Sequence, residues 1–573
     1  PLFLAFMIIR NIIFPLVIVF TLSCDDNNRS ADIIILSSVY TVNMNHPWAE
    51  ALVVRGDKII FVGDKSDALK FKNESTIVIN EPNGMVLPGF IDTHVHLLWG
   101  GIEMDECNLS GLASPGEVEL AIASYAKKYP NLEWIRGNGW SLPIFSNGNP
   151  SKEFLDKIVS ERPVYLLSSD GHSAWVNSKA LEISGVDRHT KDPKNGRIER
   201  DSVDGQPSGI LREDAMHLVE SMIPPYTKEQ IDKGLSSSVK EATKVGITSI
   251  LDAGTESYNQ KNSNLAGYDG LDAYQNATNY RTIPLRINAT QYVSPESWRE
   301  DLIRIKKRRF KNKLGTMNTV KMFTDGVIEG GTASLLEVYK GTNHYGILNW
   351  VPDTLKKVVA AYDREGFQIH FHAIGDRAIR ITLDAFEYAR NVNGFRDMRH
   401  MISHAQLIHP KDMGRFKELD IIACFQPLWA YPDPYMKELT LPVLGPVRSK
   451  WNYPLKSLVS TGARITGGSD WSVTSLNPLY GIEVAVTRKE PGNINGEVLF
   501  IEEAVDLKTI LKAYTLNAAY SLFKDNEIGS LEKNKLADIT VLDKNLFDIP
   551  HHEIHNAEVI MTIFNGEIVY DIR

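Results

Sequence analysis

Two histidines close a short apolar segment and could hold a divalent metal ion. Residues 87–96 begin with a Pro-Gly break and continue as an apolar, alternating run, which predicts a short strand. Side chains two positions apart share one face of a strand, so His94 and His96 should project together. Two neutral imidazoles held side by side suit a divalent metal ion. Considered alone, the segment is equally compatible with two histidines at the end of an ordinary strand.

Four further segments place a polar residue towards the carboxyl end of a short, strand-like apolar run. Those residues are Lys321, His372, His404 and Asp470. In a (β/α)8 barrel, the carboxyl ends of the strands build the active site. Five such segments in order along the chain therefore predict an α/β protein with a TIM-like barrel that carries a hydrolytic metal site.

The order of His-x-His, Lys, His, His and Asp resembles the amidohydrolase superfamily of metal-dependent hydrolases. Three phrases narrow the resemblance, namely residues 170–177, 372–378 and 468–471. They are similar to the branch that contains N-substituted formamide deformylase and the YtcJ-like proteins. The resemblance extends from about residue 31 to the C-terminus, so it covers nearly the whole chain.

The resemblance implies one or two divalent ions, with zinc as the expected metal. It implies that His94 and His96 bind one ion and that His372 and His404 bind the other. Lys321 would bridge the ions as a carbamate, because an unmodified ammonium group has no lone pair for a metal. An unmodified lysine that forms an ion pair is the alternative for this residue.

Asp470 and His172 are the predicted catalytic residues. By resemblance, Asp470 would bind the first ion or its water, and its carboxylate could take a proton from water and return it to a leaving amine. A bound metal can lower the pKa of water from about 15.7 to about 7, so no side-chain nucleophile is required. His172 is the candidate for polarising a substrate carbonyl. His370 shares a strand face with His372 and would either contact the site or simply pack.

Three functions are compatible with these residues. The leading hypothesis is a metal-dependent hydrolase that cleaves a C–N bond of a small-molecule amide or N-acyl compound, for example an N-formyl compound. A deaminase of a cyclic amidine would use the same hydroxide, but such enzymes typically keep an extra acid where this chain has Phe371 and Ser403. A lipoprotein whose barrel only binds a ligand would not need Asp470 together with five metal ligands. The net charge of -9 argues against nucleic acid as a partner, and a homodimer is compatible with the sequence.

Nine apolar runs resemble barrel strands, which is one more than the barrel needs. The run at residues 164–168 falls in the longest gap, so residues 100–227 are assigned to a subdomain inserted after the first barrel strand. The barrel itself would occupy residues 88–525. Residues 31–87 and 526–573 are rich in strand and hairpin signals and are predicted to form one small β-sandwich. Two separate terminal units are the alternative.

An apolar run near the N-terminus ends in Ser23-Cys24 and resembles a bacterial lipoprotein signal. Residues 1–23 would then be removed, Cys24 would carry the lipid, and residues 24–30 would form a linker. This predicts a protein anchored to a membrane of the bacterial cell envelope, on its periplasmic or outer-surface side. A plain signal peptide or a membrane-anchoring helix is the alternative. The rest of the composition is that of an ordinary globular protein, with 43% hydrophobic and 23% charged residues.

Overall fold

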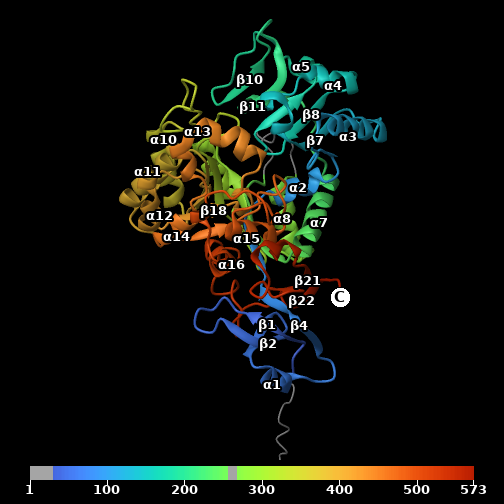
Figure 1. The fold of residues 1–573 in the computed structure, drawn as a ribbon, viewed down its shortest axis with the longest axis vertical. Coiled ribbons are helices and arrows are strands. Elements are labelled where there is room, and N and C mark those ends of the chain that lie inside the picture. The colour runs from blue at the N-terminus through green and yellow to red at the C-terminus, as the bar shows by residue number, and fades with distance from the viewer. Residues whose placement is uncertain (1–29, 256–267) are drawn as a thin grey trace, which may run out of the picture.

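The computed structural model describes residues 30–255 and 268–573. The predicted signal segment and Cys24 lie outside these residues. Within the described ranges, no helix is both long enough and apolar enough to cross a membrane. Three sheets form three tiers in Figure 1, with a barrel in the middle, an insertion above it and a sheet of both chain ends below it.

The middle tier is a nearly closed barrel of eight parallel strands, as the sequence predicted. In sheet order from the first, the strands are β5 (Phe90–Val95), β12 (Ile247–Asp252), β13 (Arg286–Tyr292), β15 (Gly315–Phe323), β16 (Gln368–Ala373), β17 (Met401–His404), β18 (Ile422–Phe425) and β19 (Ile465–Gly467). Backbone hydrogen bonds join the two ends of this sheet. Asp470 N donates to His94 O at 2.8 Å, and His96 N donates to Trp471 O at 2.9 Å. The last strand is thereby held against the first.

Helices cover the outside of the barrel, so its strands are buried on both faces. The main covering helices are α7 (Lys228–Lys244), α8 (Gly270–Tyr280), α9 (Trp298–Arg308), α10 (Pro352–Arg364), α11 (Asp376–Asn393), α15 (Pro478–Thr487) and α16 (Leu507–Ala513). Every residue of β5, β12 and β16 is buried. A parallel sheet that is covered by helices has no solvent-exposed face, so even the polar residues of these strands, such as Thr93, Ser249 and Gln368, are buried.

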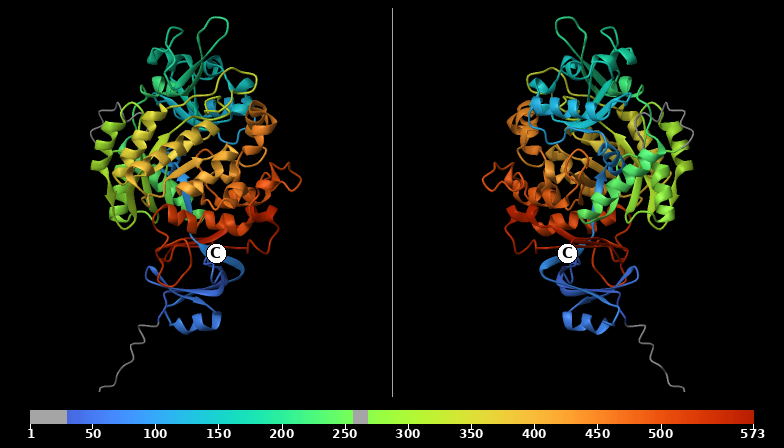
Figure 2. Two further views of the ribbon diagram at one scale, coloured as in Figure 1. Left: turned by 90° about the vertical axis from the view of Figure 1, so that its left-hand side faces the viewer. Right: turned by 90° about the vertical axis from the view of Figure 1, so that its right-hand side faces the viewer.

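The upper tier is the insertion between the first two barrel strands. Its six-stranded sheet contains, in sheet order, β10 (Gly196–Arg200), β11 (Pro207–Glu213), β9 (Ser173–Val176), β8 (Val164–Ser168), β7 (Ile135–Trp140) and β6 (Cys107–Asn108). The surplus run at residues 164–168 is therefore a strand of this sheet and not of the barrel. Trp140 and Trp175 are fully buried in the insertion's own core, with ring centroids 5.9 Å apart. Figure 2 shows this tier capping one end of the barrel.

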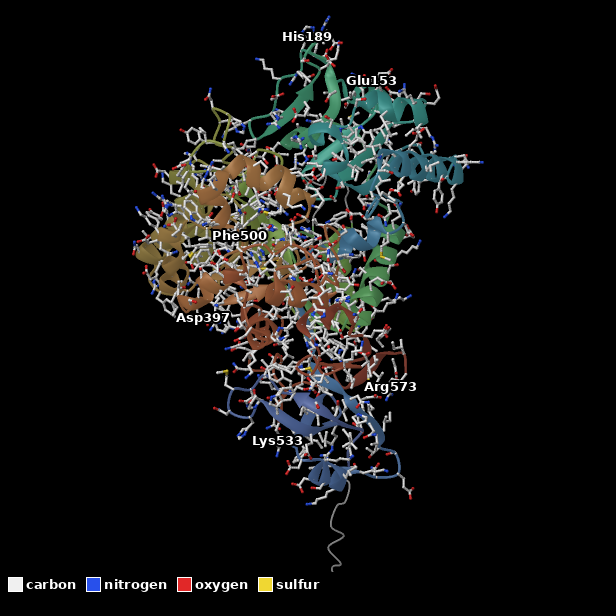
Figure 3. All side chains as sticks on the ribbon, in the orientation of Figure 1. Glu153, His189, Asp397, Phe500, Lys533 and Arg573 are labelled. Atoms are coloured by element: carbon white, nitrogen blue, oxygen red, sulfur yellow. The ribbon has the colours of Figure 1, made fainter. Side chains whose placement is uncertain are left out.

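The lower tier unites the two ends of the chain in one seven-stranded sheet. Its order is β22 (Glu567–Asp571), β21 (Val559–Phe564), β20 (Ile539–Leu542), β4 (Ile77–Pro88), β1 (Ile33–Tyr40), β2 (Trp48–Arg55) and β3 (Lys58–Gly63). The antiparallel pair of β20 and β4 joins the C-terminal strands to the N-terminal ones. Lys533 and Arg573 mark this tier in Figure 3, whereas Glu153 and His189 mark the insertion at the opposite end. Because β4 continues almost directly into β5, the sheet also anchors the strand that carries His94.

Candidate active site

The predicted metal ligands converge at one end of the barrel. His94, Lys321 and His372 lie on β5, β15 and β16, His404 ends β17, and Asp470 follows β19. His94 Nε2 lies 3.4 Å from Asp470 Oδ1, and His96 Nε2 lies 3.3 Å from the same oxygen. Lys321 Nζ lies 3.3 Å from His94 Nε2. His94, His404 and Asp470 each present a ligand atom within 4.8 Å of the others, which is a grouping that could hold a metal ion.

The backbone is unusual at two of these residues. His404 has a φ of 67° and Asp470 a φ of 55°, a conformation that non-glycine residues seldom adopt and that concentrates at functional sites. Gly468 makes the approach of Asp470 to His94 feasible, since a Cβ at Gly468 would lie 2.7 Å from His94 Cβ. The turn after β19 thus aims the Asp470 carboxylate at the histidines.

Contacts behind the histidines fix which ring nitrogen carries a proton. His372 Nε2 donates to Gly326 O at 3.1 Å, and His404 Nδ1 donates to Gln426 Oε1 at 2.8 Å. Each ring therefore keeps a lone pair on its other nitrogen, which is how outer contacts prepare histidine ligands. His94 Nδ1 lies 2.7 Å from His370 Nε2, so the structure places His370 directly behind a candidate ligand.

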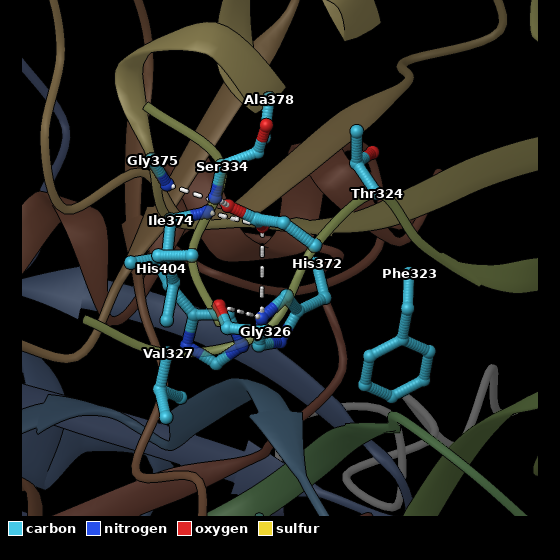
Figure 4. A network of polar contacts seen from close by, with 12 residues as sticks. Phe323, Thr324, Gly326, Val327, Ser334, His372, Ile374, Gly375, Ala378 and His404 are labelled. Atoms are coloured by element: carbon cyan, nitrogen blue, oxygen red, sulfur yellow. Dashed lines mark hydrogen bonds and ion pairs between the residues drawn. The ribbon is translucent and has the colours of Figure 1, made fainter. Parts of the chain in front are cut away.

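The loop after β15 carries the Gly326 carbonyl that contacts His372 (Figure 4). Asp325 anchors this loop through hydrogen bonds to backbone N–H groups. The Asp325 carboxylate accepts hydrogen bonds from Ser334 N at 2.8 Å, Ile374 N at 3.0 Å and Gly375 N at 2.9 Å. These bonds join the loop after β15 to the segment after β16. The carbonyl of Gly326 is consequently held in place for His372.

Burial and neighbouring charges set the ionisation of the cluster. Burial, with help from the Lys321 charge, lowers the pKa of His94 to about 3, so its ring is neutral at neutral pH. Burial also lowers the pKa of Lys321 to about 8. Burial alone would raise the pKa of Asp470, but its histidine neighbours outweigh burial and hold that pKa well below its usual range. An ionised carboxylate therefore faces neutral imidazoles.

These residues fit a divalent cation. Asp470 Oδ1 is buried and has no hydrogen-bond partner among the described residues, although two imidazole nitrogens lie within 3.4 Å of it. Buried polar atoms normally have partners, because an unsatisfied one costs about 1–3 kcal/mol. A metal ion satisfies a carboxylate oxygen and imidazole lone pairs at the same time. We call His94, His96, Lys321, His372, His404 and Asp470 the floor of the site.

The insertion contributes His172, which lies in the turn between β8 and β9. Its ring centroid is 5.2 Å from that of His372, and its Nδ1 lies 2.9 Å from Glu213 Oε2. Burial acts to lower the pKa of His172, but the charge and hydrogen bond of Glu213 outweigh burial and raise it to about 9. We call His172 and Glu213 the roof of the site.

A cavity of about 510 Å³ separates the floor from the insertion. Apolar side chains of the insertion, including Tyr165, Met216 and Tyr226, form part of its wall. Trp429 packs against the floor instead, with its ring stacked on His404 at a centroid distance of 5.5 Å. The cavity has the size and mixed polarity of a small-molecule site.

Sequence reasoning missed two residues of this arrangement, Glu213 and Gln426. Gln426 ends the β18 run as the predicted ligands end theirs, and that position was a usable signal. Glu213 is the last residue of a strand in the insertion. The pattern that places functional residues at the carboxyl ends of barrel strands does not apply there, so the pairing of Glu213 with His172 could not be predicted.

The pattern of the amidohydrolase family matches residues 78–570. The chain belongs to this family. Its members are metal-dependent hydrolases, which agrees with the grouping of His94, His404 and Asp470.

Several relatives resemble the chain over most of its length. It is 31% identical over 544 residues to "Protein LONG AFTER FAR-RED 3" of Arabidopsis thaliana, covering 94% of this chain and 92% of that protein. The "Putative amidohydrolase YtcJ" of Bacillus subtilis is 28% identical, with coverage of 93% and 98%. "N-substituted formamide deformylase" of Arthrobacter pascens is 26% identical, with coverage of 94% and 98%. The family and branch predicted from the sequence are confirmed.

Solved structures agree on the fold. An uncharacterized metal-dependent hydrolase from Pyrococcus horikoshii superposes with a TM-score of 0.70 at 24% identity, covering 91% of this chain and 99% of that one.

Proposed function

We propose that this amidohydrolase cleaves a C–N bond of an amide or N-acyl compound by hydrolysis, with Asp470 as the general base. The observation that carries the proposal is the unpartnered, ionised Asp470 carboxylate facing His94 and His96 on the cavity floor. The similarity to N-substituted formamide deformylase supports an amide, and an N-formyl compound is the first substrate to test.

In this proposal the floor holds one or two divalent ions, with zinc the first choice. His94, His96 and Asp470 would bind one ion, and His372 and His404 a second. A bound ion supplies an acidified water at neutral pH and charge stabilisation for the carbonyl oxygen. The support lies in the histidine contacts to Gly326 and Gln426, which leave ring lone pairs available.

Lys321 is proposed to bridge the ions as a carbamate. The amine adds to carbon dioxide and loses a proton, which converts a cation into an oxygen ligand. Only a neutral amine can do this, and burial lowers the pKa of Lys321 to about 8, which makes the neutral amine more accessible at neutral pH than in an exposed lysine. Without the carbamate, Lys321 would pair electrostatically with Asp470.

Asp470 and His172 have different roles: Asp470 transfers protons, and His172 donates a hydrogen bond to the substrate. Asp470 accepts a proton from the attacking water and returns it to the leaving nitrogen as the C–N bond breaks. His172 has Glu213 at its Nδ1, which leaves Nε2 as the donor for the substrate carbonyl oxygen. A pKa of about 9 keeps this ring protonated at neutral pH.

A substrate screen on the full-length, metal-loaded protein tests the function. N-formyl, N-acyl and cyclic amides are assayed for release of acid and amine, next to cyclic amidines assayed for ammonia. We expect turnover of at least one amide, lost after chelation and restored by zinc. Ammonia release from amidines alone would favour a deaminase. A folded protein that binds no metal and turns over no compound would favour a ligand-binding lipoprotein.

We also propose that an acylated Cys24 anchors the protein to the bacterial cell envelope. Mass spectrometry of membrane-extracted protein should show an N-terminal acylated Cys24, and a mature chain that keeps residues 1–23 would contradict it.

A further inference from the structure

Glu213 holds His172 through both its backbone and its side chain. Glu213 N donates to His172 O at 3.3 Å, and Glu213 Oε2 lies 2.9 Å from His172 Nδ1. Glu213 itself has a φ of 50° and a ψ of -129°, a strained conformation for a residue with a side chain. The end of β11 is thus bent in a way that turns this carboxylate towards the histidine.

The second carboxylate oxygen of Glu213 reaches the barrel. Thr332 Oγ1, in the loop after β15, donates to Glu213 Oε1 at 2.6 Å. Gly326 of the same loop makes room for that oxygen, because a Cβ there would lie 2.2 Å from it. The carbonyl of Gly326 in turn accepts the hydrogen bond from His372 Nε2. One carboxylate therefore links the roof histidine to the loop that orients a floor histidine.

Glu213 is not the only attachment of the insertion to the barrel. Tyr435 lies in a barrel-side segment, Tyr435–Thr440, and its hydroxyl accepts a hydrogen bond from Leu142 N at 3.0 Å. The same hydroxyl lies 2.6 Å from Ser169 Oγ. Because this contact does not involve Glu213, loss of the Glu213 carboxylate should free the His172 ring without releasing the insertion.

We propose that Glu213 is a positioning residue that accepts a hydrogen bond from His172 Nδ1–H and thereby fixes the orientation of this ring above the floor. The inference rests on the proposed function, in which His172 Nε2 donates to the substrate carbonyl. A carboxylate that accepts the Nδ1 proton leaves the opposite nitrogen directed to the substrate, in the way that outer carboxylates orient catalytic and metal-binding imidazoles. Thr332 keeps the carboxylate itself from rotating.

Kinetics of matched variants provide the first test. Glu213→Gln preserves shape, but its amide has one oxygen and one NH2 group, so it cannot accept hydrogen bonds from both Thr332 and His172. We expect kcat to fall about 10–100-fold, as for loss of other orienting contacts, with KM changed less than about threefold. Glu199→Gln is the matched control, because Glu199 is another half-buried carboxylate of the insertion but pairs with Arg197 and Arg212 at 2.7 Å. Its kcat should stay within about threefold of the wild type.

A double-mutant cycle separates positioning from general stability. In a His172→Gln background, Glu213→Gln should lower kcat by less than about threefold, because the group it positions is absent. An equal loss of kcat in both backgrounds, or an unchanged kcat in Glu213→Gln alone, would overturn the inference. If Glu213→Gln does not fold, Thr332→Val replaces it in the same cycle, with an expected loss of about 3–10-fold in the wild-type background only.

A spectroscopic readout works even without a substrate. In protein labelled with ¹⁵N-histidine, the Nδ1–H signal of His172 is assigned by its absence in His172→Gln. It should disappear in Glu213→Leu and remain in Glu199→Gln. Persistence in Glu213→Leu overturns the inference whether or not the wild type hydrolyses amides. Failure of the wild type to hydrolyse any amide, with the signal behaving as expected, contradicts the proposed function instead.

Discussion

The floor and the roof of the cavity are held by different means. Floor residues stand on barrel strands or directly after them, so the hydrogen-bonded barrel fixes their positions. Of the roof residues, His172 lies in a turn of the insertion and Glu213 ends β11. Both depend on side-chain contacts such as that of Thr332 with Glu213. One hydrogen bond contributes only about 0.5–1.5 kcal/mol net, so the roof is the more easily displaced of the two. The contribution of the floor to catalysis should therefore depend on the chemical identity of its side chains. The contribution of the roof should depend on how its side chains are oriented.

The strongest test of the floor is Asp470→Asn. The amide keeps the shape but cannot take a proton from water. General acid–base catalysis contributes about 10²–10⁴-fold, and an altered contact to the attacking water adds to that loss. We expect kcat to fall at least about 10³-fold with a smaller change in KM.

The controls for Asp470→Asn are its fold and its metal content. Four histidines and Lys321 remain, so thermal unfolding should stay close to that of the wild type and much of the metal should be retained. A folded, metal-loaded variant with kcat within about tenfold of the wild type would show that Asp470 is structural and that the floor does not work as proposed.

Lys321→Ala sharpens the comparison by removing a floor group that the protein must first modify. If the carbamate bridges two ions, metal content and activity should fall together, with activity lower by about 10²-fold. Short carboxylates such as formate or acetate should restore part of both, because they can occupy the bridging position. Full metal occupancy with normal turnover in this variant would leave Lys321 as a buried ion-pair partner.

Gln426→Leu addresses a contact behind the floor. The substitution leaves the Nδ1–H of His404 without its acceptor, so the ring loses its fixed tautomer. Metal affinity, measured by competition with a chelator, should weaken about 10–100-fold. Gln368→Leu is the matched control, because Gln368 is equally buried but lies at the start of β16 and donates to Arg399 O and Ser521 O. That control should lower the melting temperature and leave the metal affinity unchanged.

The sequence predicted the residues of the floor more completely than those of the roof. Each barrel strand is a short apolar run, and a polar residue at its carboxyl end could be recognised without knowing its neighbours. The contact of His94 with His370 could not be recognised from the sequence, because it joins β5 to β16, which are not adjacent in the sheet. Likewise, His172 and Glu213 lie 41 residues apart, on opposite sides of β9 and β10 in the chain. Only the folded insertion brings them together, and no spacing rule encodes such a pair.

The smallest predicted effect belongs to the roof and concerns stability rather than turnover. In the metal-free protein, Glu213 raises the pKa of His172 to about 9, against about 6.5 in an unfolded chain. The folded state then binds the extra proton between these values, so the stabilisation is complete below about pH 6.5 and is lost as pH rises through about 9. The slope is at most about 1.4 kcal/mol per pH unit. Glu213 stays ionised across this window. Burial alone would raise the pKa of Glu213, but the charge and hydrogen bond of His172 outweigh burial and lower that pKa.

Urea unfolding of the metal-free wild type and His172→Gln, at several pH values from about 6 to 9, measures the difference in stability. The stability advantage of the wild type should shrink as pH rises, and it should be absent at every pH in a Glu213→Leu background. An advantage that stays constant with pH would mean that the roof pair is not an ion pair, and that the roof holds His172 by shape alone.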